Sequence, residues 1–270
     1  MRLLHQLFFC AIGCLFVCTA NASEAKVAII IDDMGYRLTD QRAFELPQHI
    51  TFAILPHTEQ SKQFALAAHQ QGRAVMLHLP METLQPRNLG QGALMASMNA
   101  DSIAYTLDQA LLSVPHAMGV NNHMGSKLTQ LTFPMTKLME ALSKRDLFFI
   151  DSRTTRYTKA FQIAEQTGVP ALERQVFLDH ELNEDFITKQ FFRLIRLSKK
   201  YGQAIGIAHP HPLTVNILKS LIEQRKEVQF VSITELFDPT IETLDSSTIA
   251  VSKSAITSGN ALILESSSAN

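Results

Sequence analysis

The stretch VAIIIDDMG, residues 27–35, decides the fold class of this chain. Five apolar residues, four of them β-branched, run without a polar break and end at Asp32 and Asp33. A strand with one solvent-facing side alternates apolar and polar residues, whereas a parallel strand covered on both faces is apolar throughout. The stretch therefore predicts a buried parallel strand that carries two carboxylates at its carboxyl end.

Similar apolar runs recur along the chain and predict seven more strands. They cover residues 51–55, 74–79, 117–121, 147–150, 176–178, 204–208 and 228–231. The segments between them carry apolar residues at helical spacing, and Asn183 is expected to cap the longest helix, which ends near Gly202. Strands that alternate with helices predict right-handed βαβ units. Seven or eight such units form either a closed (β/α) barrel or a doubly wound open sheet.

Polar residues gather where the predicted strands end. In parallel α/β folds the functional residues lie at the carboxyl ends of the strands. The sequence places these groups there: Asp32-Asp33, Pro56-His57, His78, Asn121-Asn122-His123, Asp151-Ser152-Arg153, Asp179-His180 and His209-Pro210-His211. The amino ends offer mainly ordinary charged residues. This asymmetry predicts one site at the carboxyl edge, built from carboxylates and imidazoles.

The adjacent carboxylates Asp32 and Asp33 could take two different roles at such a site, one as a metal ligand and the other as a general base. Neighbours on a regular strand point to opposite faces, so both can face the site only if the strand has ended. A metal ion on one carboxylate would relieve their mutual repulsion and leave the other as a general base. The alternative is a turn and helix cap before Gly35.

Two histidines complete a predicted metal set with Asp33. Two neutral imidazoles and one carboxylate, with an open position for water, are typical of catalytic zinc. His78 and His123 are the candidate imidazoles, and the alternative for His78 is a core histidine. Pro80 favours a loop after His78, and a loop is also expected around His123. Glu82 is a further candidate ligand.

Two prolines follow the histidines of the last polar group. They favour an extended backbone at His209 and His211, which would hold both imidazoles in fixed positions. One of them could donate a proton to a leaving group, and the alternative is a rigid loop with solvated histidines. Asp151 either orients a ligand histidine or belongs to a salt-bridged turn.

The first 22 residues differ from the rest of the chain. A cation at Arg2, an uncharged apolar run over Leu7–Val17 and the small residues of Ala20-Asn21-Ala22 predict a signal peptide cleaved after residue 22. An uncleaved anchor and a lipoprotein site at Cys14 are the alternatives. Cleavage would remove all three cysteines. The apolar run is short for a membrane span of about 20 residues, and no other stretch is long and apolar enough to cross a bilayer. The mature protein is expected to be exported, either to a periplasm or beyond the cell.

The rest divides into a body and a tail. Residues 23–238 are expected to form one barrel domain, and the serine-rich residues 239–270 a flexible extension. The formal net charge is -1, which gives no support for nucleic-acid binding. The chain contains no Trp, the residue that most often stacks on sugars. Sequence patterns of phosphate-binding loops, dinucleotide-binding loops and serine-hydrolase elbows are absent.

The polar groups together resemble the divergent polysaccharide deacetylase family over residues 27–237. The resemblance rests on the motifs IIIDDMG (29–35), HLPME (78–82), NNHMGS (121–126), FIDSR (149–153) and AHPHP (208–212). It implies a distorted (β/α) barrel related to metal-dependent carbohydrate N-deacetylases. The family pattern would make Asp32 the base, Asp33 a metal ligand and His209 the acid. This sequence departs from that pattern at one point, because Glu82 stands where a second metal histidine is usual. Either Glu82 or His123 must then complete the site, or metal binding is weakened.

Three functions follow from this resemblance. The first is an enzyme that uses a divalent metal, expected to be zinc, to remove N-acetyl groups from an envelope or extracellular carbohydrate. The second is a catalytically weak or inactive protein that binds a glycan or an envelope partner. The third is a metal-dependent amidase or esterase with a non-sugar substrate, whose chemistry at the metal would be the same.

Overall fold

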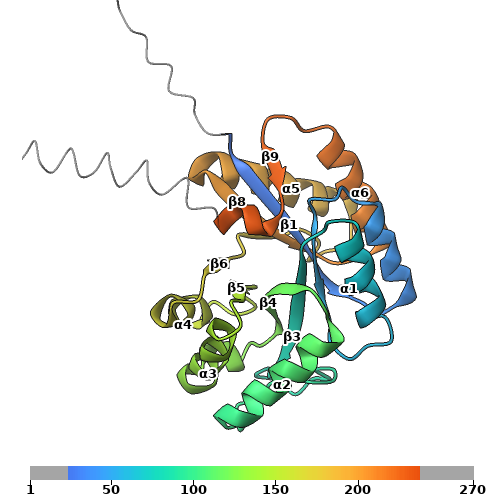
Figure 1. Cartoon of the computed structure of the whole chain (residues 1–270). Coiled ribbons are helices and arrows are strands. Elements are labelled where there is room, and N and C mark those ends of the chain that lie inside the picture. Colours follow the sequence, from blue (N-terminus) through green and yellow to red (C-terminus); the bar gives the residue numbers. More distant parts are fainter. Residues whose placement is uncertain (1–23, 238–270) are drawn as a thin grey trace, which may run out of the picture.

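The computed structural model describes residues 24–237 (Figure 1). The predicted signal peptide (1–22) and serine-rich tail (239–270) lie outside the described residues. Within residues 24–237, no helix combines the length and the apolar character that a membrane crossing requires.

One parallel sheet forms the centre of the fold. Its strands are β1 (Lys26–Met34), β2 (Thr51–Ile54), β3 (Val75–Met81), β4 (Ala117–Met124), β5 (Phe148–Asp151), β6 (Ala171–Glu173), β7 (Val176–Phe177), β8 (Gln203–Ala208) and β9 (Gln229–Val231). They follow the order β6-β5-β4-β3-β2-β1-β8-β7, and β9 pairs with the amino-terminal part of β1. The sheet is curled, and within the described residues no ladder joins its two end strands, β6 and β7. The barrel is therefore open on this side and forms a half-barrel. The predicted distorted (β/α) barrel is confirmed, and β6 is a strand that sequence patterns missed.

Helices between the strands cover the outer face of this sheet (Figure 1). They are α1 (Ser61–Gln70), α2 (Ala100–Ser113), α3 (Thr132–Ser143), α4 (Ala160–Thr167), α5 (Glu184–Tyr201) and α6 (Pro212–Glu223), with short 3-10 turns η1 (Leu38–Glu45), η2 (Leu128–Gln130) and η3 (Ile233–Phe237). Asn183 caps α5 as expected, since its side chain accepts a hydrogen bond from the Phe186 amide.

The apolar run of β1 contributes to two separate cores. Ile29 and Ile31 belong to the larger cluster, which includes the buried faces of the helices. Ala28 and Ile30 belong to a smaller cluster of strand residues, which includes Leu236 of η3. The first cluster lies between sheet and helices and the second fills the concave inner face. Burial on both faces explains why the run has no polar break.

Two strands extend further than the sequence predicted. We expected loops at Pro80 and around His123, but β3 continues to Met81 and β4 to Met124. In a parallel strand the N–H and C=O of one residue point to the same side. The Pro80 carbonyl accepts from the Leu94 amide, so its missing N–H faces Leu94 and leaves the ladder to β4 intact.

Candidate metal centre and its pocket

Strand alternation directs most of the site residues to the concave face. Ile30, Met76 and Ile207 belong to the inner cluster, and positions two residues further along these strands are Asp32, His78 and His209. The same alternation sends Asn121 and His123 to one face of β4, and His78 pairs with Asn121 across the ladder. Five polar side chains thus reach the mouth of the half-barrel from four strands, β1, β3, β4 and β8.

Asp33 is the exception, because regular alternation would turn it away from Asp32. The β1–β2 ladder shifts register between Ile31 and Met34. Asp33 itself has a left-handed backbone with φ of 56°, a region that Asp tolerates better than most residues. The bulge turns the Asp33 side chain to the mouth, although the strand continues to Met34. Our expectation that the strand must already have ended was therefore wrong.

Asp33, His78 and His123 bring three donor atoms together. The Asp33 Oδ1 lies 3.1 Å from the His78 Nε2 and 2.9 Å from the His123 Nδ1, and the two nitrogens are 3.1 Å apart. Zinc bonds of about 2.1 Å in a tetrahedral arrangement separate the ligand atoms by about 3.4 Å. The three atoms therefore have close to the spacing that one metal ion requires.

Asn121 fixes the proton on His78. Its side-chain oxygen lies 2.7 Å from the His78 Nδ1, and its amide nitrogen donates to the Asp32 Oδ1 at 2.8 Å. Because that oxygen can only accept, His78 donates through Nδ1 and directs the lone pair of Nε2 at the other two ligands. A ring held in this way is the usual support of a metal-binding histidine.

The charges around Asp33 favour a cation. Its Oδ1 is buried and has no hydrogen bond of good geometry among the described residues. Burial acts to raise the pKa of Asp33, but the neighbouring His123 and His78 rings outweigh it and hold the pKa well below its usual range. Asp33 is thus an ionised, half-buried carboxylate whose unsatisfied oxygen faces two imidazole nitrogens. This donor set fits a divalent metal ion such as zinc.

Asp32 is almost fully buried beside this set. Burial raises the pKa of its carboxyl group, and the opposing effect of His78 and His209 is smaller. The Asp32 Oδ2 lies 3.7 Å from the His78 Nε2. A carboxylate with a raised pKa accepts a proton more readily, which suits a general base next to a metal.

His209 approaches the site from the end of β8. Its Nδ1 lies 2.9 Å from the Asp179 Oδ1, its backbone amide donates to the Asp179 Oδ2, and Thr214 donates to the same oxygen. The His209 Nε2 lies 3.8 Å from the Asp33 Oδ2. Burial would lower the pKa of His209, but Asp179 and the other carboxylates raise it to about 9. The imidazole is therefore charged at neutral pH and can donate through Nε2.

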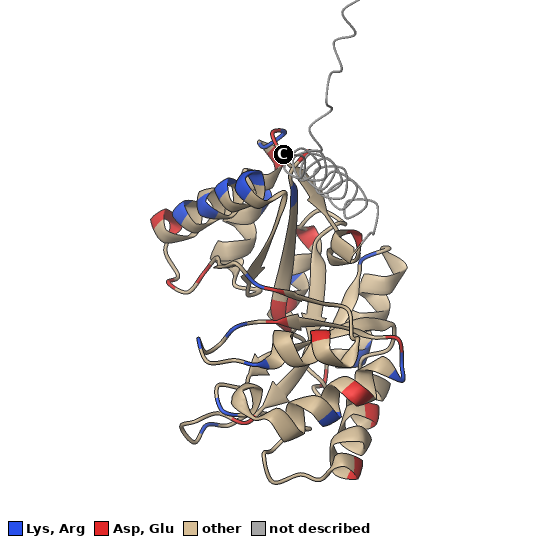
Figure 2. Cartoon of the chain, turned by 90° about the vertical axis from the view of Figure 1, so that its left-hand side faces the viewer, with Lys and Arg blue, Asp and Glu red and all other residues tan. Residues whose placement is uncertain are grey.

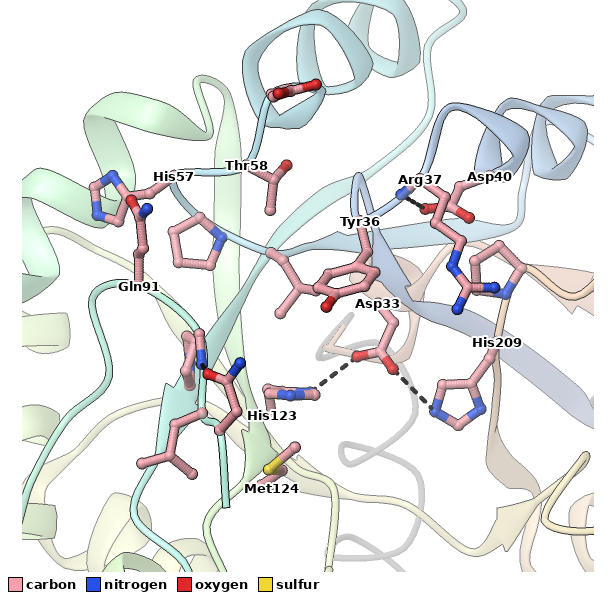
Figure 3. Close-up of a pocket in the computed structure, with 18 of the residues that line it drawn as sticks. Asp33, Tyr36, Arg37, Asp40, His57, Thr58, Gln91, His123, Met124 and His209 are labelled. Atoms are coloured by element: carbon pink, nitrogen blue, oxygen red, sulfur yellow. Dashed lines mark hydrogen bonds and ion pairs between the residues drawn. The ribbon is translucent and has the colours of Figure 1, made fainter.

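A cavity of about 550 Å³ opens in front of these residues (Figure 3). Asp33, His123 and His209 border it on one side, and Figure 3 shows the Asp33 carboxylate between the two imidazoles. Loops after β2 and β3 supply His57 and Gln91 to its wall. Tyr36 is 67% exposed and lines the same cavity, so the cavity offers an exposed aromatic ring although the chain contains no Trp.

The three secondary candidates lie elsewhere or at the edge. Glu82 forms an ion pair with Lys127 and accepts from the Ala96 amide, so it is not one of the converging atoms. Asp151 stands two residues after Phe149, which belongs to the outer cluster, so its side chain points to the same outer side of β5. It accepts hydrogen bonds from the Arg153 amide and the Thr158 hydroxyl. It therefore organises the turn after β5, although the ion pair of this turn joins Arg153 to Glu173 and not to Asp151.

His211 is exposed and lines the cavity, with its ring centre 6.4 Å from that of His209. It stands beside the site without contacting the three converging atoms.

Sequence reasoning missed two important contacts. Asn121 was visible in its motif, but its bridging position depends on the pairing of β3 with β4. Asp179 follows a predicted strand, but the sequence does not show that β7 pairs with β8. Its contact with His209 could therefore not be predicted. The neighbouring strand ends bring Asp179 to His209.

Comparisons with known proteins agree with this architecture. The family model described as "Divergent polysaccharide deacetylase" matches residues 29–237. The uncharacterized protein YibQ of Escherichia coli K12 is 39% identical over 213 residues, which are 78% of this chain and 67% of that protein. An uncharacterized protein of Haemophilus influenzae is 36% identical over 217 residues, covering 80% of this chain and 78% of its own length.

One solved structure has the same fold over most of its length. The uncharacterized protein ATU2773 from Agrobacterium tumefaciens superposes with a TM-score of 0.77 at 22% identity. The match covers 80% of this chain and 91% of that protein.

The His209–Asp179 contact predicts a measurable titration. In protein kept free of divalent metal, His209 should titrate with a pKa of about 9. Because this lies above the ordinary value of about 6.5, the contact stabilises the fold fully below that pH, and the contribution is lost as pH rises through 9. Asp179→Asn should lower the pKa by at least about one unit, as measured by NMR of the imidazole resonances. Asp185→Asn, an exposed acid on α5, is the matched control. An equal pKa in Asp179→Asn and the parent would contradict the assignment.

Proposed function

The chain belongs to the divergent polysaccharide deacetylase family, and on that premise we propose that it removes N-acetyl groups from an envelope or extracellular carbohydrate. The observation that carries the proposal is the convergence of Asp33, His78 and His123, with Asp32 and His209 beside them, on one cavity. Metal ligands, a base and an acid are the groups that metal-assisted amide hydrolysis requires.

We assign the metal site to Asp33, His78 and His123. A zinc ion bound there would polarise an acetamide carbonyl and lower the pKa of bound water. Two imidazoles and one carboxylate also bind other divalent ions, and zinc fits because its catalytic sites commonly combine three such ligands with an open position. The role of Asn121 is to keep the His78 lone pair directed at the site.

Asp32 is the proposed general base. Its carboxylate is anchored through Oδ1 by Asn121, which leaves Oδ2 free to accept a proton beside the ligand set. The buried position excludes bulk water and strengthens the base. Asp32 therefore takes the proton from the attacking water and does not bind metal.

His209 is the proposed general acid. Its pKa of about 9 keeps it protonated at neutral pH, and its Nε2 faces the site across from Asp32 and Asp33. In the closing step this proton passes to the departing amine of the sugar. Asp179 acts as a positioning residue because it holds the Nδ1 proton and the ring orientation.

In this chain a residue on a neighbouring strand takes the place of the usual second metal histidine. Glu82 occupies the position of the usual second histidine, and its carboxylate pairs with Lys127. His123 lies on β4, which pairs directly with β3, and supplies the third donor atom. We propose that this substitution changes which strand holds the ligand while the number of ligands stays at three.

We also propose that the protein acts outside the cytoplasm. The support is the leader pattern in the first 22 residues, with its positive start, apolar run and small residues. An N-acetylated glycan of the cell envelope would then be within reach of the cavity.

Metal binding provides the first test. Protein purified without its leader and loaded with zinc should hold about one ion per chain. Asp33→Ala, His78→Ala and His123→Ala should each lose it, because each removes one of three donor atoms. Asn121→Ala should weaken binding about 10- to 100-fold, since it releases the His78 ring. Metal content by mass spectrometry and affinity by titration calorimetry are the measurements.

Glu82→Gln is the matched control for these variants, and its zinc content should equal that of the parent. Loss of zinc in Glu82→Gln with retention in His123→Ala would reverse the assignment of the third ligand.

Turnover provides the second test. Asp32→Asn should retain zinc but release acetate from N-acetylated oligosaccharides about 100- to 10,000-fold more slowly, because the general base is gone. Asp146→Asn changes an exposed acid far from the cavity and should keep the parent rate. Acetate release by Asp32→Asn at the parent rate would contradict the assigned mechanism. A zinc-loaded parent that releases acetate from no N-acetylated sugar while it cleaves other amides would refute the substrate class.

A further inference from the structure

Helix α5 carries a stripe of cations on its outer face. Lys189, Arg193, Arg196 and Lys200 follow at intervals of four, three and four residues, which places them on one side of a helix, and Lys199 stands beside them. All five are exposed, whereas Phe191, Leu194 and Ile195 of the same helix are buried in the core. Figure 2 shows the resulting blue bands along this helix.

Within residues 24–237, none of the cations of the stripe forms an ion pair. The ion pairs of Lys and Arg among the described residues use other cations, namely Lys127, Lys137, Arg145, Arg153, Lys219 and Arg225. Lys199 and Lys200 in the last turn favour the helix through its dipole. Lys189, Arg193 and Arg196 lie outside that turn, so the dipole does not account for them.

The location of the stripe separates it from the cavity. Gly202, which follows α5, accepts a hydrogen bond from the Lys26 amide at the start of β1, and the Lys26 side chain donates to the Glu235 carbonyl of η3. The basic end of α5 therefore lies at the amino ends of the strands, where the described chain also begins and ends. The cavity lies at the opposite, carboxyl ends.

We propose that this face of α5 docks on an anionic phospholipid surface. A straight helix presents its outer side chains along one line, and several Lys and Arg residues on such a line match a negatively charged bilayer. Tyr201 at the end of the stripe is 62% exposed, with the Lys200 ammonium 4.8 Å from its ring centre. Tyrosine favours the boundary between headgroups and acyl chains. Docking at this end would leave the cavity open on the far side.

Two other negatively charged partners would also match the positive charge of this face of α5. A soluble acidic polysaccharide could lie along the same line, and residues 238–270 contain four acids and one lysine. The bilayer is favoured because the cations lie on an exposed helix, border only a shallow open hollow, and stand beside an exposed tyrosine. The proposal does not depend on the metal site or on the deacetylase assignment.

Vesicle binding tests the proposal. Protein that retains its tail but lacks residues 1–22, whose apolar run could insert by itself, is mixed with vesicles of phosphatidylcholine and increasing phosphatidylglycerol. Binding should rise with phosphatidylglycerol and fall with added salt. Arg193→Gln/Arg196→Gln removes two cations, keeps good helix formers and should weaken binding roughly thirtyfold.

The matched control is Lys62→Gln/Lys144→Gln, which removes two exposed cations from other parts of the surface. It should bind vesicles like the parent, and both double variants should melt like the parent. Equal loss in the two double variants, or no dependence on phosphatidylglycerol, would overturn the proposal. Tighter binding to a soluble acidic polysaccharide than to vesicles, lost in the α5 variant, would replace the bilayer as the partner. A gain in binding when Asp238, Glu242 and Asp245 are changed to amides would instead identify the tail as the resident occupant.

Discussion

The bulge at Asp33 is the constraint on which the site depends. On a regular strand, Asp32 would face the concave side and Asp33 the helices, and the three donor atoms would never meet. The register shift and the left-handed backbone of Asp33 bring both carboxylates to the mouth. Such a conformation costs about 1–2 kcal/mol for a residue with a side chain. Strain of this kind persists where the surrounding structure holds it, and here β2 and β8 pair with β1 on its two sides.

With Asp33 in this position, the other groups fall into two chains of hydrogen bonds. One runs from Asp32 through Asn121 to His78, and the other joins Asp179 to His209. Each chain holds a proton on Nδ1 and leaves Nε2 facing the mouth, as a lone pair on His78 and as an N–H on the charged His209. The arrangement separates a lone-pair donor at His78 from a proton donor at His209, and the two carboxylates of Asp32 and Asp33 stand between them.

Much of the fold, and the edge of the sheet at which the candidate site lies, could be predicted from the sequence. The continuous apolar run of β1 predicted a strand buried on both faces, and the polar residues after each run predicted the edge at which the site lies. The family resemblance added the distortion of the barrel, which the open seam between β6 and β7 confirms. Asp151 directly follows Ile150, which faces inward, so strand alternation alone could have excluded Asp151 from the inner face.

Other features required coordinates. The continuation of β3 through Pro80 depends on the Leu94 segment beside it, which is distant in sequence. The position of Asp179 next to His209 depends on the pairing of two strands separated by α5. Glu82 lies just after the end of β3 at Met81, whereas His123 still lies within β4, so their different contacts depend on where each strand ends.

We propose that Asp33, His78 and His123 hold one metal ion. Anomalous diffraction at the zinc absorption edge, from crystals of zinc-loaded protein, would locate this ion. One strong peak is expected about 2.0–2.2 Å from the Asp33 Oδ1, the His78 Nε2 and the His123 Nδ1. A peak bound by Glu82, or no peak among these three atoms at saturating zinc, would contradict this proposal.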